Sequence, residues 1–124
     1  MRAIPLPSSG AIRAAIVASL QRGDATLDST ARALKVSSRT LQRHLGRMGT
    51  SHSKLLAEVR LNAACHLLAD SSKRLSDIAK LLGYSNASSF SRTFARLMKV
   101  QPVVYRRKQR ARKLSGRVIA RDRA

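Results

Sequence analysis

One predicted helix has two chemically different faces, because its polar residues are interleaved with leucines. The polar residues are Arg39, Gln42 and Arg43, and the leucines are Leu41 and Leu45. The two leucines are four residues apart, so they share a face and predict contact with a core. The three polar side chains then point outward. In the DNA major groove, arginine pairs with guanine and glutamine with adenine through two hydrogen bonds each. The alternative is contact with phosphate or solvent only, and the surrounding motif favours base reading.

A matching segment later in the chain has aromatic residues where the first has leucines. Phe90 and Phe94 predict the buried face of a second helix. Its exposed positions carry mostly small side chains, which can contact thymine methyls, bases or phosphates but offer fewer hydrogen bonds. We therefore expect the first segment to discriminate bases and the second to anchor the protein on the DNA. The arginine of the second segment is the exception, because it can also discriminate bases. The exposed residues of the second segment are Ala87, Ser88, Ser91 and Arg92.

Contacts to the DNA backbone are expected from a second group of residues. Ser37 and Ser85 precede the two segments, and both are predicted helix N-caps, as is Thr26 for an earlier helix. The free amides of a helix N-terminus attract phosphate, and basic side chains position a protein on the duplex. The backbone candidates are Ser37, Ser85, Thr93, Arg96, Arg106 and Arg107.

The charge of the chain fits a polyanionic partner. Its 124 residues include 25 Lys and Arg against 6 Asp and Glu, a net charge of +19. Residues 106–124 hold nine basic residues and one acid, a local +8, so +11 remains on the other 105 residues. Charge alone does not separate DNA from RNA or an anionic membrane. Two interpretations of the basic C-terminal segment have equal weight: it follows the DNA backbone, or it is a solvated tail.

The two segments belong to a half-hidden repeat of a short helix, a tight turn and a longer helix. Residues 31–37 resemble residues 79–85, 48 positions later, and one extra residue precedes the second long helix. The apolar spacing predicts an all-α, two-lobed chain of seven helices. These are residues 11–22, 27–34, 38–48, 53–69, 75–82, 86–98 and a short helix from Pro102 to about Arg107.

The predicted domain organisation follows from these elements. Residues 1–10 are expected to be a flexible lead-in, residues 11–107 the folded domain, and residues 108–124 a disordered basic tail. Within the domain, the helix-turn-helix units are residues 27–48 and 75–98, joined by a long connector helix over residues 53–69.

Several motifs, in the right order and at the right separation, resemble the DNA-binding domain of the AraC/XylS family. In the first half they are residues 37–43, the turn at residues 49–51 and residues 60–61. In the second half they are residues 77–79, 82–85, 89–94 and 102–106.

The resemblance implies two lobes whose third and sixth helices enter successive major grooves, so that a monomer reads a bipartite site. It implies double-stranded DNA as the partner and bacterial transcription regulation, mostly activation. The chain departs from the family pattern at Lys99, where glycine is usual, and Lys35 stands where the second half has Gly83. A left-handed lysine costs about 1 kcal/mol, so we expect looser turns there.

Other classes of function have little support in the sequence. The three histidines and Cys65 show no metal-ligand spacing, and the six acids form no catalytic pair. We therefore expect no enzyme activity, metal or cofactor. No segment is long enough to span a membrane, and a single cysteine suits the cytoplasm, with the protein on the nucleoid. The competing hypotheses are a sequence-specific regulator, which is compatible with an additional contact to RNA polymerase, and an architectural DNA-binding protein with low sequence preference.

Overall fold

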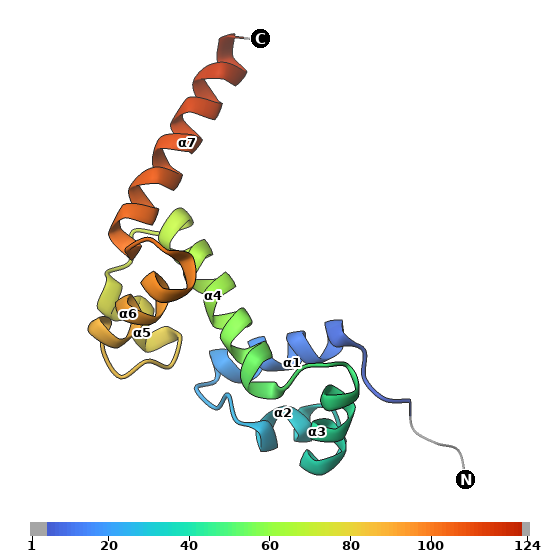
Figure 1. The fold of residues 1–124 in the computed structure, drawn as a ribbon. Helices are drawn as coiled ribbons and strands as arrows, with labels where there is room; N and C mark the ends of the chain where they lie inside the picture. The colour runs from blue at the N-terminus through green and yellow to red at the C-terminus, as the bar shows by residue number, and fades with distance from the viewer. Residues whose placement is uncertain (1–4, 123–124) are drawn as a thin grey trace. The chain divides into compact units, whose positions relative to one another are not determined.

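A computed structural model describes the backbone of residues 5–122 and the side chains of residues 5–115 (Figure 1). It contains only helices in this part of the chain, which confirms the all-α, seven-helix prediction. The helices are α1 (Ser9–Gln21), α2 (Leu27–Ala33), α3 (Ser38–Arg47), α4 (His52–Asp70), α5 (Leu75–Leu81), α6 (Ala87–Met98) and α7 (Pro102–Asp122).

The chain divides into two compact units, and the boundary falls within α4, between Asn62 and Ala63. The first unit holds α1, α2, α3 and the first part of α4, and the second holds the rest. Each unit therefore contains one helix-turn-helix, as the two-lobed prediction requires. The connector helix contributes to both cores: Leu55 and Val59 are buried in the first unit, and Ala64 and Leu68 in the second.

The core of the first unit combines aliphatic side chains with buried hydroxyl groups. Ile12 and Ile16 of α1 are fully buried. Beside them the hydroxyls of Ser19 and Ser29 are 3.4 Å apart, which gives each buried group a hydrogen-bonding partner. Thr30, also fully buried, has its hydroxyl 3.1 Å from His52 Nε2 and so ties α2 to the start of α4.

The core of the second unit is built around four aromatic rings in sequence. Tyr84 and Phe90 have ring centroids 5.6 Å apart, Phe90 and Phe94 5.8 Å, and Phe94 and Tyr105 5.4 Å. These tilted and edge-on pairs are the geometries that aromatic quadrupoles favour. The chain of rings links the turn before α6, α6 itself and the first turn of α7.

The two helix-turn-helix units use the same hydrogen-bonded turn. After α2, the amide of Val36 donates to the carbonyl of Ala31 at 3.0 Å, and after α5 the amide of Tyr84 donates to the carbonyl of Ala79 at 2.9 Å. Both bonds join residues five apart around a left-handed residue, which is the Schellman arrangement. The half-hidden repeat in the sequence therefore corresponds to a repeated backbone path.

The left-handed positions of these turns match the sequence prediction. Gly83 has φ 85° and Lys35, at the equivalent position, has φ 59°. Lys99 ends α6 with φ 61°. Both lysines therefore occupy a conformation that glycine adopts without steric cost and that an L side chain strains.

Three sequence predictions on helix ends are wrong. Asn86, not Ser85, is the N-cap of α6, because its side-chain oxygen accepts a hydrogen bond from the amide of Ser89 at 2.8 Å. α1 begins at Ser9, within the expected lead-in, because Ser8 caps it. α7 does not end near Arg107 but continues to Asp122, through most of the expected disordered tail. Residues 1–4 of the lead-in and 123–124 of the tail lie outside the described residues.

Candidate nucleic-acid interface

The second helix of the first helix-turn-helix, α3, has the two faces that the sequence predicted. Leu41 and Leu45 are fully buried, whereas Arg39, Gln42 and Arg43 are exposed. The exposed face therefore carries two guanidinium groups and one carboxamide on a helix whose register is fixed by its leucines. A donor array of this kind can hydrogen-bond to guanine and adenine edges.

The start of α3 is held by local hydrogen bonds. The side chain of Ser37 accepts a bond from the amide of Thr40 at 3.1 Å, which confirms the predicted N-cap. Thr26 caps α2 in the same way through the amide of Ser29, also at 3.1 Å. The hydroxyl of Ser38 donates to the carboxylate of Asp28 in α2. The first turn of α3 is thus fixed to α2 before any ligand binds.

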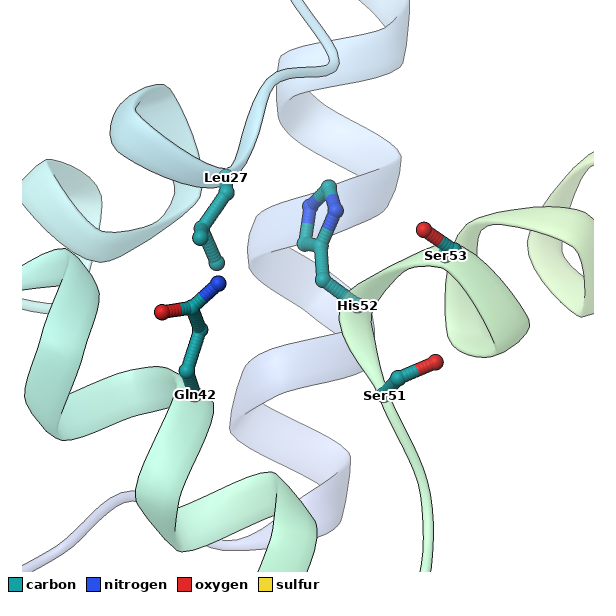
Figure 2. A pocket seen from close by; sticks show the side chains of 5 residues that line it. All are labelled: Leu27, Gln42, Ser51, His52 and Ser53. Atoms are coloured by element: carbon teal, nitrogen blue, oxygen red, sulfur yellow. The ribbon is translucent and has the colours of Figure 1, made fainter.

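A hollow of about 300 Å³ lies beside α3 (Figure 2). Gln42 points across it toward Leu27, and His52 contributes its ring. Burial, followed by the positive charge of Arg60, lowers the pKa of His52, so that its neutral form is favoured. Of the remaining lining residues, Ser51 immediately precedes α4 and Ser53 lies in its first turn.

The corresponding helix of the second unit, α6, presents a less polar face. Phe90 and Phe94 are each 1 % exposed. Arg92 and Ser88 are exposed, and the small side chains of Ala87 and Ser91 are half-buried. Arg92 is therefore the one long hydrogen-bonding side chain among the residues predicted to read bases here, as the sequence indicated.

The residues predicted to contact the DNA backbone lie in several environments. Ser37, Ser85, Arg96 and Arg107 are exposed, and Thr93 is half-buried. Ser85 lacks the capping role on which its prediction was partly based, because Asn86 takes it.

Arg106, another backbone candidate, has a different role in the structure. Its Nε donates to the carbonyl of Leu68 at 2.9 Å, and a terminal guanidinium nitrogen lies 3.4 Å from the carbonyl of Leu67. Burial, followed by the charge of Arg110, lowers its pKa. Its guanidinium therefore stabilises the C-terminal end of α4.

Sequence reasoning missed several residues that support these helices. His44 on α3 has Nε2 2.8 Å from the carbonyl of Pro7, which joins the N-terminal segment to the predicted base-reading helix. Arg13 of α1 forms an ion pair with Glu58 of α4 at 2.5 Å. Only the Asn86 cap had a local signal, because asparagine caps helices as well as serine. The other two contacts join residues far apart in the chain, so spacing could not reveal them.

The described residues form neither a metal centre nor a membrane-spanning helix. Among residues 5–115, whose side chains the structure describes, no cluster of three His, Cys, Asp or Glu is arranged to hold a metal ion. No helix in that range has the length and apolar character needed to cross a bilayer. Cys65 is half-buried beside Tyr105, whose pKa is raised mainly by burial and then by a hydrogen bond with that thiol. This is the setting of a packing residue.

The fold and the exposed face of α3 define the chain first as a helix-turn-helix protein, and a family model described as a helix-turn-helix domain matches residues 30–108. A transcriptional regulator from Chromobacterium violaceum, described as containing an AraC-type DNA-binding domain, is 31% identical with a TM-score of 0.61. The alignment covers 80% of this chain and 89% of that one. The chain belongs to the AraC-type family of DNA-binding domains, whose members are transcription regulators.

Further relatives agree with this assignment. The C-terminal domain of AraT, a response regulator from Geobacillus stearothermophilus, is 33% identical with a TM-score of 0.63, over 81% of this chain and 86% of that one. The ornithine utilization regulator of Pseudomonas aeruginosa is 38% identical over 80 residues, which are 64% of this chain and 24% of the relative. The chain thus spans about a quarter of the length of such curated relatives.

Proposed function

We propose that this chain is the DNA-reading part of a sequence-specific transcription regulator. The observation that carries the proposal is the exposure of Arg39, Gln42 and Arg43 above the buried leucines of α3. These side chains are free of core packing and have the hydrogen-bonding groups for direct readout of bases. The function is therefore recognition of DNA rather than catalysis.

The two units would read adjacent major-groove segments from one chain. α3 supplies base discrimination, and α6 supplies anchoring through Ser88, Ser91 and Ala87, with Arg92 reading a base. Ser37, Ser85, Thr93 and Arg96 contact the backbone in this proposal. Because both helix-turn-helix units lie on the same chain, a monomer suffices for a bipartite site.

We infer activation as the regulatory outcome, because a relative of this chain is an activator. The urease operon transcriptional activator of Escherichia coli is 33% identical over 84 residues, which are 68% of this chain and 28% of that protein. An activator acts on RNA polymerase, so we propose the polymerase as a second partner, with the protein bound to the nucleoid in the cytoplasm.

The test begins with duplexes that the protein selects from a random pool. In gel shifts, the selected duplex should resist random competitor DNA, and the two half-sites should be protected about one helical turn apart. Inserting about five base pairs between the half-sites should cripple binding, because the second groove then faces the opposite side. Unchanged affinity after this insertion would show that one unit alone docks, and the bipartite proposal would fail.

The competing function is an architectural DNA-binding protein with little sequence preference. The small exposed side chains of α6 and the charge of +19 favour it, because such a surface binds phosphates without reading bases. Equal competition by selected and random DNA would establish this function in place of the regulator.

A further inference from the structure

The sequence of α7 alone disfavours the helix that the structure contains. Its described side chains include Arg106, Arg107, Lys108, Arg110, Arg112 and Lys113. Like charges three and four residues apart on a helix repel one another, so a helix this basic needs support from elsewhere. The contacts of α7 within the second unit show where the support comes from.

One face of α7 is held on the C-terminal end of α4. This anchored face consists of Arg106, Arg110 and Lys113, which share one side of the helix because of their spacing. Besides the two bonds of Arg106 described above, Arg110 donates to the carbonyl of Ser71 at 3.2 Å. Lys113 donates to the carbonyl of Ala69 at 3.3 Å and forms an ion pair with Asp70.

These contacts are electrostatically favourable for a general reason. The last carbonyls of a helix have no partners within the helix, and they form the negative end of its macrodipole. The anchored face supplies three cations to this end of α4, with donors for the carbonyls of its last turn and of the residue that follows it. The beginning of α7 is fixed as well, because Pro102 is buried and Tyr105 packs edge-on against Phe94.

A second set of basic residues lies on the other side of the same helix. This exposed basic face consists of Arg107, Lys108 and Arg112, all exposed. At about 3.6 residues per turn, it is centred roughly 180° from the anchored face. Among the described residues, none of these three side chains has a hydrogen bond or ion pair. α7 is therefore basic on two faces, of which one is used for folding.

We propose that the exposed basic face of α7 binds the phosphate backbone of duplex DNA beside the segment that α6, in the same unit, reads. This proposal rests on the DNA-binding function proposed above and adds to it a third contact, which reads no sequence. Arg107 and Arg112 are separated along the helix axis by about 7.5 Å. Phosphates follow one another at about 3.4 Å along the axis for each strand, so the face spans two or three of them.

The chemistry of the face favours DNA over a membrane surface. A helix that lies on a bilayer needs a continuous apolar face beside its basic one. Val103 and Leu114 are the large apolar side chains of α7 that are exposed, and only Ala111 lies among the basic residues; two exposed side chains eleven residues apart do not form such a continuous face. A shallow hollow lined by Val104, Arg107, Lys108 and Ala111 follows this surface, and a strand of phosphates complements its charge.

The test compares the full chain with two triple variants. The exposed-face variant carries Arg107→Gln, Lys108→Gln and Arg112→Gln. A charge-matched control carries Arg22→Gln, Lys73→Gln and Arg74→Gln, which are exposed residues outside α3, α6 and α7. The salt dependence of binding is measured on the selected duplex and on a random duplex, and circular dichroism reports helix content.

The slope of log affinity against log salt should become shallower by about 2–3 in the exposed-face variant, because each phosphate contact contributes about 0.9. The control should change it by less than about 1, since its residues are not among the proposed DNA contacts. Preference for the selected duplex should be unchanged. Replacing Arg107 and Arg112 by lysine should retain the parental slope, because phosphate contact requires charge and not a planar guanidinium.

Several results would overturn the proposal. The first is an exposed-face variant whose salt slope equals that of the parent, and the second is a control whose slope changes as much as that of the variant. The third is a variant that no longer prefers the selected duplex, which would mean that the exposed basic face reads bases. Binding of the parent to phosphatidylserine vesicles, lost in the exposed-face variant while DNA binding persists, would assign the face to membranes. Failure of the parent to bind either duplex would instead refute the DNA-binding function itself, and this proposal with it.

Discussion

The two helix-turn-helix units share a backbone path but differ in what fills and covers it. α2 and α3 enclose leucines, isoleucines and buried hydroxyls, and their outer face carries two arginines and a glutamine. α5 and α6 enclose aromatic rings, and their outer face is mostly alanine and serine. The same backbone can therefore support an outer face rich in hydrogen-bonding groups or one of small side chains. This is because the hydrogen-bonded turn fixes the backbone path whichever side chains the outer face carries.

Removing an aromatic ring from the second unit should have the largest effect on stability. Phe90→Ala should lower the free energy of unfolding of that unit by about 3–5 kcal/mol, because the ring is 1 % exposed and contacts two other rings. Denaturant titration measures the loss, and footprinting should show protection by the first unit alone. Leu97→Ala, at an exposed position of the same helix, is the control and should have a small effect. Parental stability in Phe90→Ala would mean that the register of α6 is wrong.

The difference between the two outer faces should appear in binding. Arg43→Ala should cost about 1–3 kcal/mol on the selected duplex and less on random DNA, because a bidentate base contact is lost. Ser91→Ala in the second unit should cost less and affect both duplexes alike. Gel-shift titrations measure both losses. If Arg43→Ala weakened both duplexes equally, Arg43 would be a phosphate contact.

The N-caps of α3 and α6 allow a finer comparison of the two units. Asn86→Ala and Ser37→Ala should each lower stability by about 1 kcal/mol, because each removes the acceptor for a free amide of the first turn. Ser85→Ala should have almost no effect on thermal unfolding. A larger loss in Ser85→Ala than in Asn86→Ala would restore the cap that the sequence predicted.

In the turn that the two units share, replacing lysine by glycine and replacing glycine by alanine should change stability in opposite directions. Lys35→Gly should raise stability by about 0.5–1 kcal/mol, because relief of left-handed strain exceeds the greater entropy of glycine in the unfolded chain. Gly83→Ala should lower it by a similar amount. Thermal unfolding measures both. A loss in Lys35→Gly would show that the lysine side chain stabilises the turn in another way.

The smallest expected effect concerns acid and belongs to the first unit. The pKa of His52 is lowered in the folded state, so the unfolded chain binds its proton more tightly. The stabilisation that this group contributes is therefore present above the ordinary histidine pKa of about 6.5 and is lost as the pH falls below it. Denaturation curves above and below this pH give the change in the free energy of unfolding. That change should be smaller in His52→Gln than in the parent. An unchanged difference would assign the acid sensitivity to other groups.

The sequence predicted features that depend on local spacing. The buried leucines and exposed polar residues of α3, the left-handed glycine at residue 83 and the cap at Ser37 all follow from neighbours along the chain. Choosing between Ser85 and Asn86 required the backbone path, because both side chains can cap a helix. That the exposed residues of α3 contact bases stays a prediction, because exposure shows only that a side chain can reach a partner.

The length of α7 could not be predicted from its composition. The low apolar content of residues 108–124 predicted disorder there, whereas the groups that stabilise the helix are backbone carbonyls at and just beyond the end of a helix about 40 residues earlier in the chain. No pattern in residues 102–124 reveals those carbonyls. The Arg13–Glu58 ion pair escaped prediction for the same reason.

The chain of aromatic rings also makes the second unit its own spectroscopic probe. The protein has no tryptophan, two tyrosines and two phenylalanines, and all four rings lie in the second unit. Tyrosine fluorescence and near-ultraviolet dichroism therefore report on that unit alone, whereas far-ultraviolet dichroism reports on both. In the unmodified protein, a midpoint that differs between the two signals would reveal independent melting of the units without any label.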